Sequence, residues 1–112
     1  MRGLAAALLL GSPAAAAGWS NTDLGPAEPL VQCIARAELT LAGLAPAKLE
    51  TGAWQAAAAG ISGGLSARII CLPERVVLVI EGDPAAKRAG LCRRIVTRWK
   101  RTGPGPQAEC RQ

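Results

Sequence analysis

Four cysteines in a chain of 112 residues restrict the fold of this sequence more than any other feature. A chain of this length buries only a modest core and often needs covalent cross-links. The cysteines are Cys33, Cys71, Cys92 and Cys110. An even number in a short exported chain indicates two disulfides. A zinc site usually includes a close Cys-x-x-Cys pair, and the sequence has no such pair and no histidine, so we expect neither a metal nor another cofactor.

Four cysteines allow three pairings, and the spacing of the apolar residues favours one of them. Cys33 falls on the apolar stripe of a predicted helix and Cys71 on the inner face of a predicted strand, so the two could meet where helix and sheet pack. Cys92 falls on a second stripe, and a Gly/Pro turn could return Cys110 to it. We therefore prefer Cys33–Cys71 with Cys92–Cys110. The pairing of Cys71 with Cys92 and of Cys33 with Cys110 remains open as the second choice.

The first 17 residues have the pattern of a secretory signal peptide. Arg2 supplies the positive start, residues 4–10 form an apolar run, and small residues lead to a cleavage site near Ala17. The run is shorter than the roughly 20 residues that cross a bilayer, and no later stretch reaches that length, so we expect no membrane span. Abundant alanine and a preference for arginine over lysine are typical of GC-rich bacteria. These features together predict a periplasmic or secreted protein.

A single α+β domain is predicted over residues 29–102. Residues 18–28 are polar and contain Gly, Asn and Pro, which predicts a flexible lead-in. Residues 29–44 repeat apolar side chains at three- and four-residue steps, which is typical of a helix with one buried stripe. Arg36 and Thr40 fall on the opposite side of that helix, so we expect them to face the solvent.

About three strands are predicted between this helix and a second one. Residues 65–72 alternate apolar and polar side chains, residues 75–81 are rich in valine, and the short turn between them predicts an antiparallel hairpin. Residues 48–56 predict a weaker strand, because alanine and glycine are poor strand formers. The alanine-rich segment that follows, up to Gly64, is expected to be a loop or a frayed helix.

The second helix is predicted from Pro84 to about Arg101. Asp83 can cap its first N–H groups, and proline suits the first helical position. Glycine and proline end the helix, and residues 103–112 are expected to form a tail that Cys110 ties back. The expected fold is therefore α+β in the order α-β-β-β-α, with both helices on one face of a small antiparallel sheet.

The second helix also lies in the most basic part of the chain. Residues 84–112 carry eight basic side chains and one acidic side chain, whereas residues 18–83 carry four basic and seven acidic side chains. On a helical wheel, the side opposite the apolar stripe gathers Lys87, Arg94, Arg98 and Arg101. These side chains could simply be the solvent-facing side of a structural helix. They could also bind an anionic partner, either a protein or an envelope polymer, because a solvating helix usually mixes charge signs.

Other functions have less support from the sequence. Nucleic-acid binding usually needs aromatic side chains that stack on bases, and Trp99 falls on the apolar stripe, so we expect no sequence-specific nucleic-acid partner. Residues 60–64 match the Gly-x-Ser-x-Gly elbow of serine hydrolases, but the chain has no histidine base, and Ser62 is expected to be a loop residue. We therefore expect no enzyme activity; the alternative is a small envelope enzyme that uses Glu81 or Asp83.

The segment RIICLPERVVLVIEGDP, together with Cys33 and Trp54, resembles small, exported, uncharacterised proteobacterial α/β domains with paired cysteines. The resemblance covers roughly residues 30–100 and implies the fold and the exported location, but no activity. The expected role is a small periplasmic or secreted binding module. Such a module could be inhibitor-like, or it could contact anionic envelope partners through its basic helix.

Overall fold

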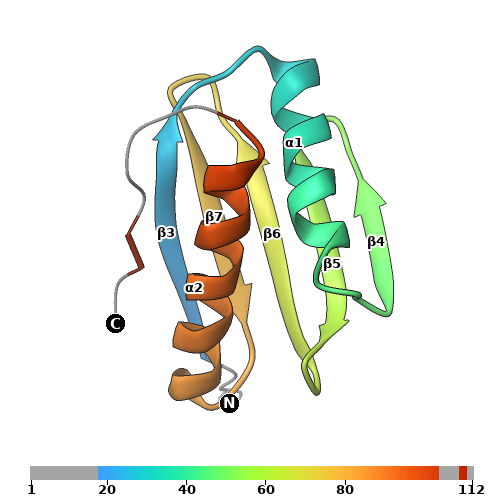
Figure 1. Cartoon of the computed structure of the whole chain (residues 1–112), viewed down its shortest axis with the longest axis vertical. Helices are drawn as coiled ribbons and strands as arrows, with labels where there is room; N and C mark the ends of the chain where they lie inside the picture. Colours follow the sequence, from blue (N-terminus) through green and yellow to red (C-terminus); the bar gives the residue numbers. More distant parts are fainter. Residues whose placement is uncertain (1–17, 104–108, 111–112) are drawn as a thin grey trace, which may run out of the picture.

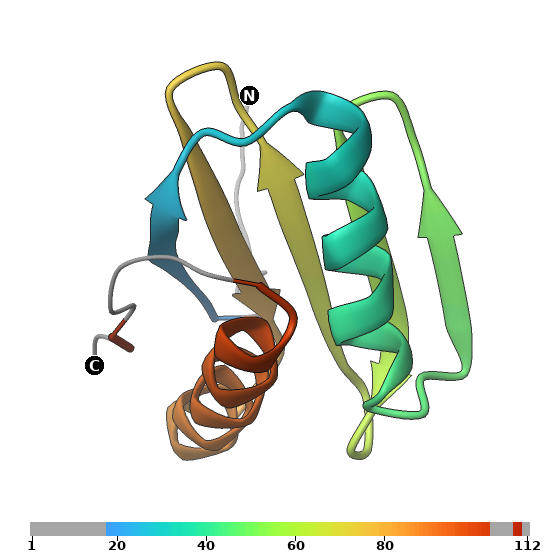
Figure 2. The same ribbon diagram turned by 45° about the horizontal axis from the view of Figure 1, so that its top comes forward.

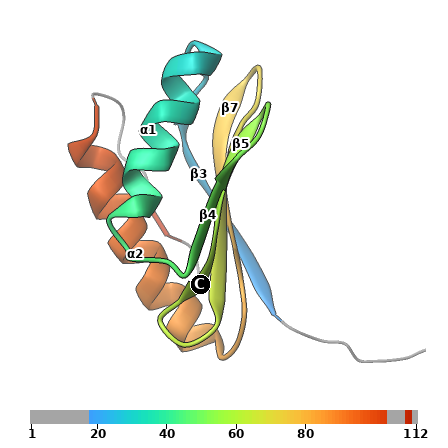
Figure 3. The ribbon, with the colours of Figure 1, turned by 90° about the vertical axis from the view of Figure 1, so that its right-hand side faces the viewer.

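A five-stranded antiparallel sheet supports two helices that both cover the same face (Figures 1 and 3). The structure is a computed structural model that describes residues 18–103, 109 and 110. Its elements are β3 (Trp19–Pro26), α1 (Leu30–Ala42), β4 (Lys48–Thr51), β5 (Gln55–Ile61), β6 (Leu65–Cys71), β7 (Arg75–Glu81) and α2 (Ala85–Arg101). The strand order across the sheet is β3-β7-β6-β5-β4.

The α+β class is as predicted, whereas the predicted count of about three strands is too low. The predicted signal peptide and residues 104–108 and 111–112 of the tail lie outside the described residues.

The predicted hairpin of β6 and β7 is the centre of the sheet. The two strands pair antiparallel, with Ile69 opposite Leu78 and Cys71 opposite Val76. Inward side chains alternate with half-exposed ones along both strands, and Ile69, Val76 and Leu78 have no solvent exposure. This two-residue period places one apolar face beneath the helices.

The expected flexible lead-in is wrong for most of residues 18–28, because residues 19–26 form the edge strand β3. Strand β3 pairs with β7, with Thr22 opposite Leu78. Only Leu24 and Thr22 are buried from this strand, so its own sequence lacks the apolar alternation that marks a strand. The strand is held in place by contacts with distant parts of the chain. For example, the indole N–H of Trp99 in α2 donates to the backbone oxygen of Leu24 at 3.2 Å. The domain therefore begins before residue 29.

The alanine-rich segment also differs from the expectation of a loop or a frayed helix. Residues 55–61 form β5, and the predicted strand at 48–56 is divided between β4 and β5. Ala56 and Ala58 are buried beneath α1. Their small side chains suit a strand on which a helix packs closely, and pairing with β4 and β6 on either side offsets their poor strand propensity. Residues 62–64 form the turn to β6, so Ser62 is a loop residue as predicted.

Helix α1 packs over β4, β5 and β6, and α2 packs over β3 and β7 (Figure 2). Cys33, Ala37 and Leu41 form the buried stripe of α1, as its periodicity predicts. The expectation that Arg36 and Thr40 face the solvent is wrong, because this side of α1 packs against the last turn of α2. A helical wheel considers one helix alone and assigns its polar side to the solvent. It cannot show that a second helix covers part of that side.

Helix α2 buries the predicted apolar stripe, which consists of Leu91, Cys92, Ile95, Val96 and Trp99. Its N-terminus differs from the prediction, because the Asp83 side chain makes no capping hydrogen bond to the helix. Asp83 instead accepts hydrogen bonds from the backbone N–H of Gly18 at 3.0 Å and from Arg88 at 3.2 Å. It therefore links the start of β3 to α2.

Two disulfides join Cys33 to Cys71 and Cys92 to Cys110. This is the preferred pairing of the two that the sequence left open. The first bridge connects α1 to the end of β6, and the second connects the middle of α2 to the tail. Disulfides of this kind are typical of proteins in oxidising, extracytoplasmic compartments. In residues 18–103, 109 and 110, no helix has the length and apolar character needed to cross a membrane.

Candidate functional site

Helix α2 carries seven basic side chains and no acidic one: Lys87, Arg88, Arg93, Arg94, Arg98, Lys100 and Arg101. Of these seven side chains, only Arg88 forms an ion pair with a described residue, which is Asp83. Arg88 also donates to the backbone oxygen of Gly82 at 2.6 Å, and its side chain is 15% exposed. Arg88 is therefore a structural residue at the start of α2, and the other six cations remain without a carboxylate partner within the described part of the chain.

Arg98 extends from α2 toward the end of α1. Its Nε donates to the backbone oxygen of Thr40 at 2.9 Å. A Cβ atom at Gly43 would collide with the Arg98 guanidinium, so the glycine at the end of α1 gives this side chain its space. The last carbonyls of a helix carry partial negative charge, which makes this a favourable position for a cation.

Arg94 and Lys87 extend instead toward the turn between β5 and β6. Arg94 Nη1 donates to the Ser62 hydroxyl at 3.0 Å. Lys87 Nζ lies 3.6 Å from the position that a Cβ atom of residue 63 would occupy. The turn therefore brings a hydroxyl group and two cations together at the surface. Its backbone joins two strands, which excludes the strand-to-helix elbow that the Gly-x-Ser-x-Gly pattern would need.

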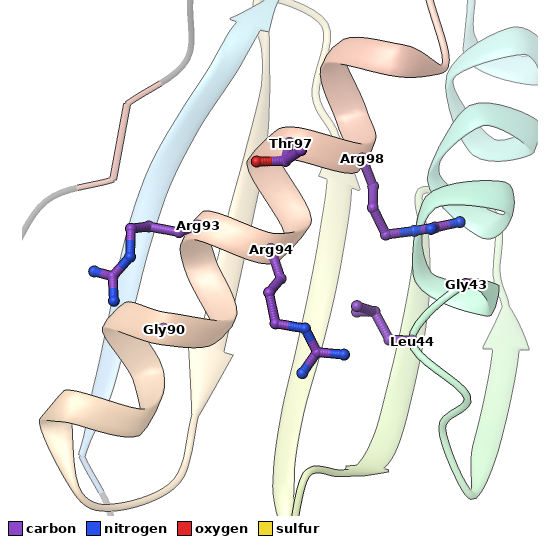
Figure 4. A pocket seen from close by; sticks show the side chains of 7 residues that line it. All are labelled: Gly43, Leu44, Gly90, Arg93, Arg94, Thr97 and Arg98. Carbon is purple, nitrogen blue, oxygen red and sulfur yellow. The ribbon is translucent and has the colours of Figure 1, made fainter.

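These side chains border two adjoining hollows, one between α2 and the segment after α1 and one between α2 and the β5–β6 turn. The larger, of about 420 Å³, is lined by Gly43, Leu44, Gly90, Arg93, Arg94, Thr97 and Arg98 (Figure 4). The smaller, of about 230 Å³, is lined by Ser62, Leu65, Lys87, Gly90, Leu91 and Arg94. The two share Gly90 and Arg94, and together we call them the basic groove. In Figure 4, Arg94 and Arg98 point toward the side of Leu44, whereas Arg93 extends to the other side of the helix.

Three of the four predicted anion-binding residues line the basic groove: Lys87, Arg94 and Arg98. Arg101 is exposed on the last turn of α2 and lines neither hollow. The sequence prediction missed Gly90, although it lies three residues from Lys87 and four from Arg94, a spacing that places it on the same side of the helix. It also missed Ser62 as a neighbour of Arg94, because that contact joins residues 32 positions apart.

The two carboxylates of the alternative enzyme prediction have different surroundings. Glu81 follows the buried Ile80 in the alternation of β7, so it lies on the sheet face opposite the core, where it lines a hollow of about 140 Å³ with Lys48, Glu50 and Arg68. Asp83 does not line that hollow and is bound to Gly18 and Arg88. Within residues 18–103, 109 and 110, no three side chains among His, Cys, Asp and Glu are grouped to hold a metal ion.

Comparison with protein-family models, curated proteins and solved structures finds no match for this chain. The similarity to small exported domains with paired cysteines therefore stays an expectation from the sequence.

Proposed function

We propose that this protein is a small, exported, non-catalytic binding module that holds an anionic partner in its basic groove. The observation that carries the proposal is the position of Lys87, Arg94 and Arg98, which line the two adjoining hollows and form no ion pair among the described residues. Guanidinium groups suit this role because their planar N–H donors match the oxygens of carboxylate, sulfate and phosphate groups.

Stability alone does not account for this charge pattern. Arg94 and Arg98 are four residues apart on α2, and like charges at this spacing destabilise a helix. Exposed charges contribute little to stability, so stability alone does not explain why so many cations of one sign lie on this helix. An anionic group bound between Arg94 and Lys87, or between Arg94 and Arg98, would reduce the repulsion between the cations. It would also accept hydrogen bonds from their N–H groups.

The proposed location follows from other features of the chain. Two disulfides favour an oxidising compartment, and the pattern of residues 1–17 predicts export with cleavage near Ala17. The periplasm or the outside of a cell supplies anionic partners of several kinds, including acidic proteins and envelope polysaccharides. An inhibitor-like role would require an acidic protein surface, and it is an outcome of the experiment below.

The proposal is tested with two variants that remove the same charges from different surfaces. Lys87→Gln/Arg94→Gln alters the groove, and Lys48→Gln/Arg75→Gln removes one lysine and one arginine from exposed strand positions. Binding to immobilised heparin, dextran and poly-glutamate is measured at low and high salt. We expect the groove variant to lose about tenfold or more in affinity for an anionic probe, because a hydrogen bond to a charged group contributes roughly 1.5–3 kcal/mol.

The control variant separates a binding site from a general effect of net charge. Equal losses in the two variants would mean that the groove has no special role and would contradict the proposal. The proposal would also be contradicted if the wild-type protein bound neutral dextran as strongly as it bound heparin and poly-glutamate. High salt should weaken binding of the wild-type protein strongly, because mobile ions screen exposed charges.

A further inference from the structure

Gly90 lies in the middle of α2, where a glycine weakens the helix. Packing does not require it there. The nearest heavy atom to a Cβ at this position would be Arg93 Nη2 at 3.9 Å, which is ordinary van der Waals contact. Gly43 and Gly82 differ, because a Cβ at either would collide with a neighbouring side chain. Gly90 is therefore a costly residue that the fold does not demand.

Gly90 lines both hollows of the basic groove and therefore lies where the two hollows adjoin. A side chain at this point would project into the groove and divide it. Because glycine has no side chain, the two hollows stay open next to each other along α2, with Lys87 lining one and Arg98 lining the other. The helix rises by about 16 Å between these two residues, which is the length of several linked sugar units.

We propose that the basic groove binds one extended strand of an anionic polysaccharide, which passes directly over Gly90. This inference rests on the proposed function and adds the class of ligand and the role of the glycine. One acidic group of the strand binds between Lys87 and Arg94, beside the Ser62 hydroxyl. Another binds between Arg94 and Arg98. The strand bears sulfate, phosphate or carboxylate groups, which all accept the paired N–H donors of arginine.

Three features of the groove favour a polysaccharide over other polyanions. An extended peptide needs partners for its backbone N–H and C=O groups, and α2 has already paired its own backbone internally. Nucleic-acid bases need aromatic surfaces for stacking, and the residues that line the two hollows include no aromatic ring. Sugar hydroxyls can instead pair with the exposed hydroxyl groups of Ser62 and Thr97, one in each hollow.

The test fills the groove without altering its charge. Gly90→Leu places a bulky side chain at the junction, and Ala86→Leu adds the same side chain at an exposed position on α2 that lines neither hollow. The full chain is prepared in its oxidised form, and circular dichroism verifies that each variant is folded. Affinities are measured for heparin-derived oligosaccharides from disaccharide to octasaccharide, and for poly-glutamate of similar length.

We expect Gly90→Leu to weaken octasaccharide binding by about tenfold or more, whereas Ala86→Leu leaves it unchanged. The wild-type affinity should rise with length until the oligosaccharide spans the groove, and Gly90→Leu should remove that rise. If Gly90→Leu binds like the wild type while Lys87→Gln/Arg94→Gln does not, the proposed function stands and this inference is overturned. Tighter binding of poly-glutamate than of every oligosaccharide would overturn the choice of ligand. If no anionic probe binds, both proposals fail.

Discussion

The guanidinium carbon of Arg36 lies 3.8 Å from the centroid of the Trp99 ring, so a buried cation joins the two helices. The same side chain donates to the Thr102 hydroxyl at 2.9 Å and to the backbone oxygens of Trp99 at 2.8 Å and Gly103 at 3.2 Å. It also pairs with Glu28, which precedes α1. Arg36 therefore binds one carbonyl of the last turn of α2 and one just beyond the helix, and it holds the two helices beside each other, which in turn positions the basic groove.

Replacement of Arg36 should destabilise the whole domain. Arg36→Met removes one donor from the Trp99 carbonyl and one from the Gly103 carbonyl, and it leaves Glu28 without its cation, so we expect the free energy of unfolding to fall by about 2–4 kcal/mol. Urea denaturation measures the change. Arg93→Met removes an exposed arginine from α2 and should stay within about 0.5 kcal/mol of the wild type. If both variants unfold at the same urea concentration, the Arg36 contacts contribute no net stability.

Both disulfides should contribute to stability, and the bridge that closes the longer loop should contribute more. The bridges span 38 and 18 residues, and chain-entropy arguments assign them about 4 and about 3 kcal/mol. We expect Cys33→Ala/Cys71→Ala to unfold at a lower urea concentration than Cys92→Ala/Cys110→Ala, and both to unfold below the wild type. A reductant should lower the midpoint of the wild-type protein as well. A midpoint that reductant leaves unchanged would show that the bridges do not stabilise the fold.

Gly90→Ala should make the protein more stable. Alanine is the better helix former, and a Cβ at this position meets no close neighbour, so we expect a gain of about 0.5–1 kcal/mol. Thermal unfolding followed by circular dichroism measures it as a higher Tm. A loss of stability would instead show that the fold itself requires glycine here, and it would contradict the proposed role of Gly90 in keeping the groove open.

Two glycines with positive φ should respond differently to the same substitution. Gly82 has φ of +129° and Gly64 has φ of +112°, so alanine is strained at both positions. A Cβ at residue 82 would also collide with Leu65, whereas no atom lies within 4 Å of one at residue 64. We therefore expect Gly82→Ala to cost about 1–3 kcal/mol more than Gly64→Ala. Equal urea midpoints would mean that Leu65 moves aside without cost.

Local periodicity in the sequence correctly predicted the two helices, the β6–β7 hairpin and the faces that carry the cysteines. Each of these depends on a repeat within one segment, such as the alternation in Val76, Leu78 and Ile80. The same periodicity placed Lys87, Arg94 and Arg98 on one side of α2. It could not show that the β5–β6 turn lies beside Arg94, since no pattern within α2 encodes a contact with Ser62.

The sequence by itself determined which residues would be helical, which strands would alternate, and where the positive charge would gather, because these properties depend on neighbours along the chain. Only the tertiary structure decided that residues 19–26 and 55–61 are strands, because their pairing with β7 and with β4 and β6 outweighs weak local propensity. It also decided the burial of Arg36 and the existence of the groove. Arg36 is buried where α1 meets α2, and the groove forms where α2 lies beside the segment after α1 and the β5–β6 turn. The free energy of such contacts depends on segments that are far apart in sequence.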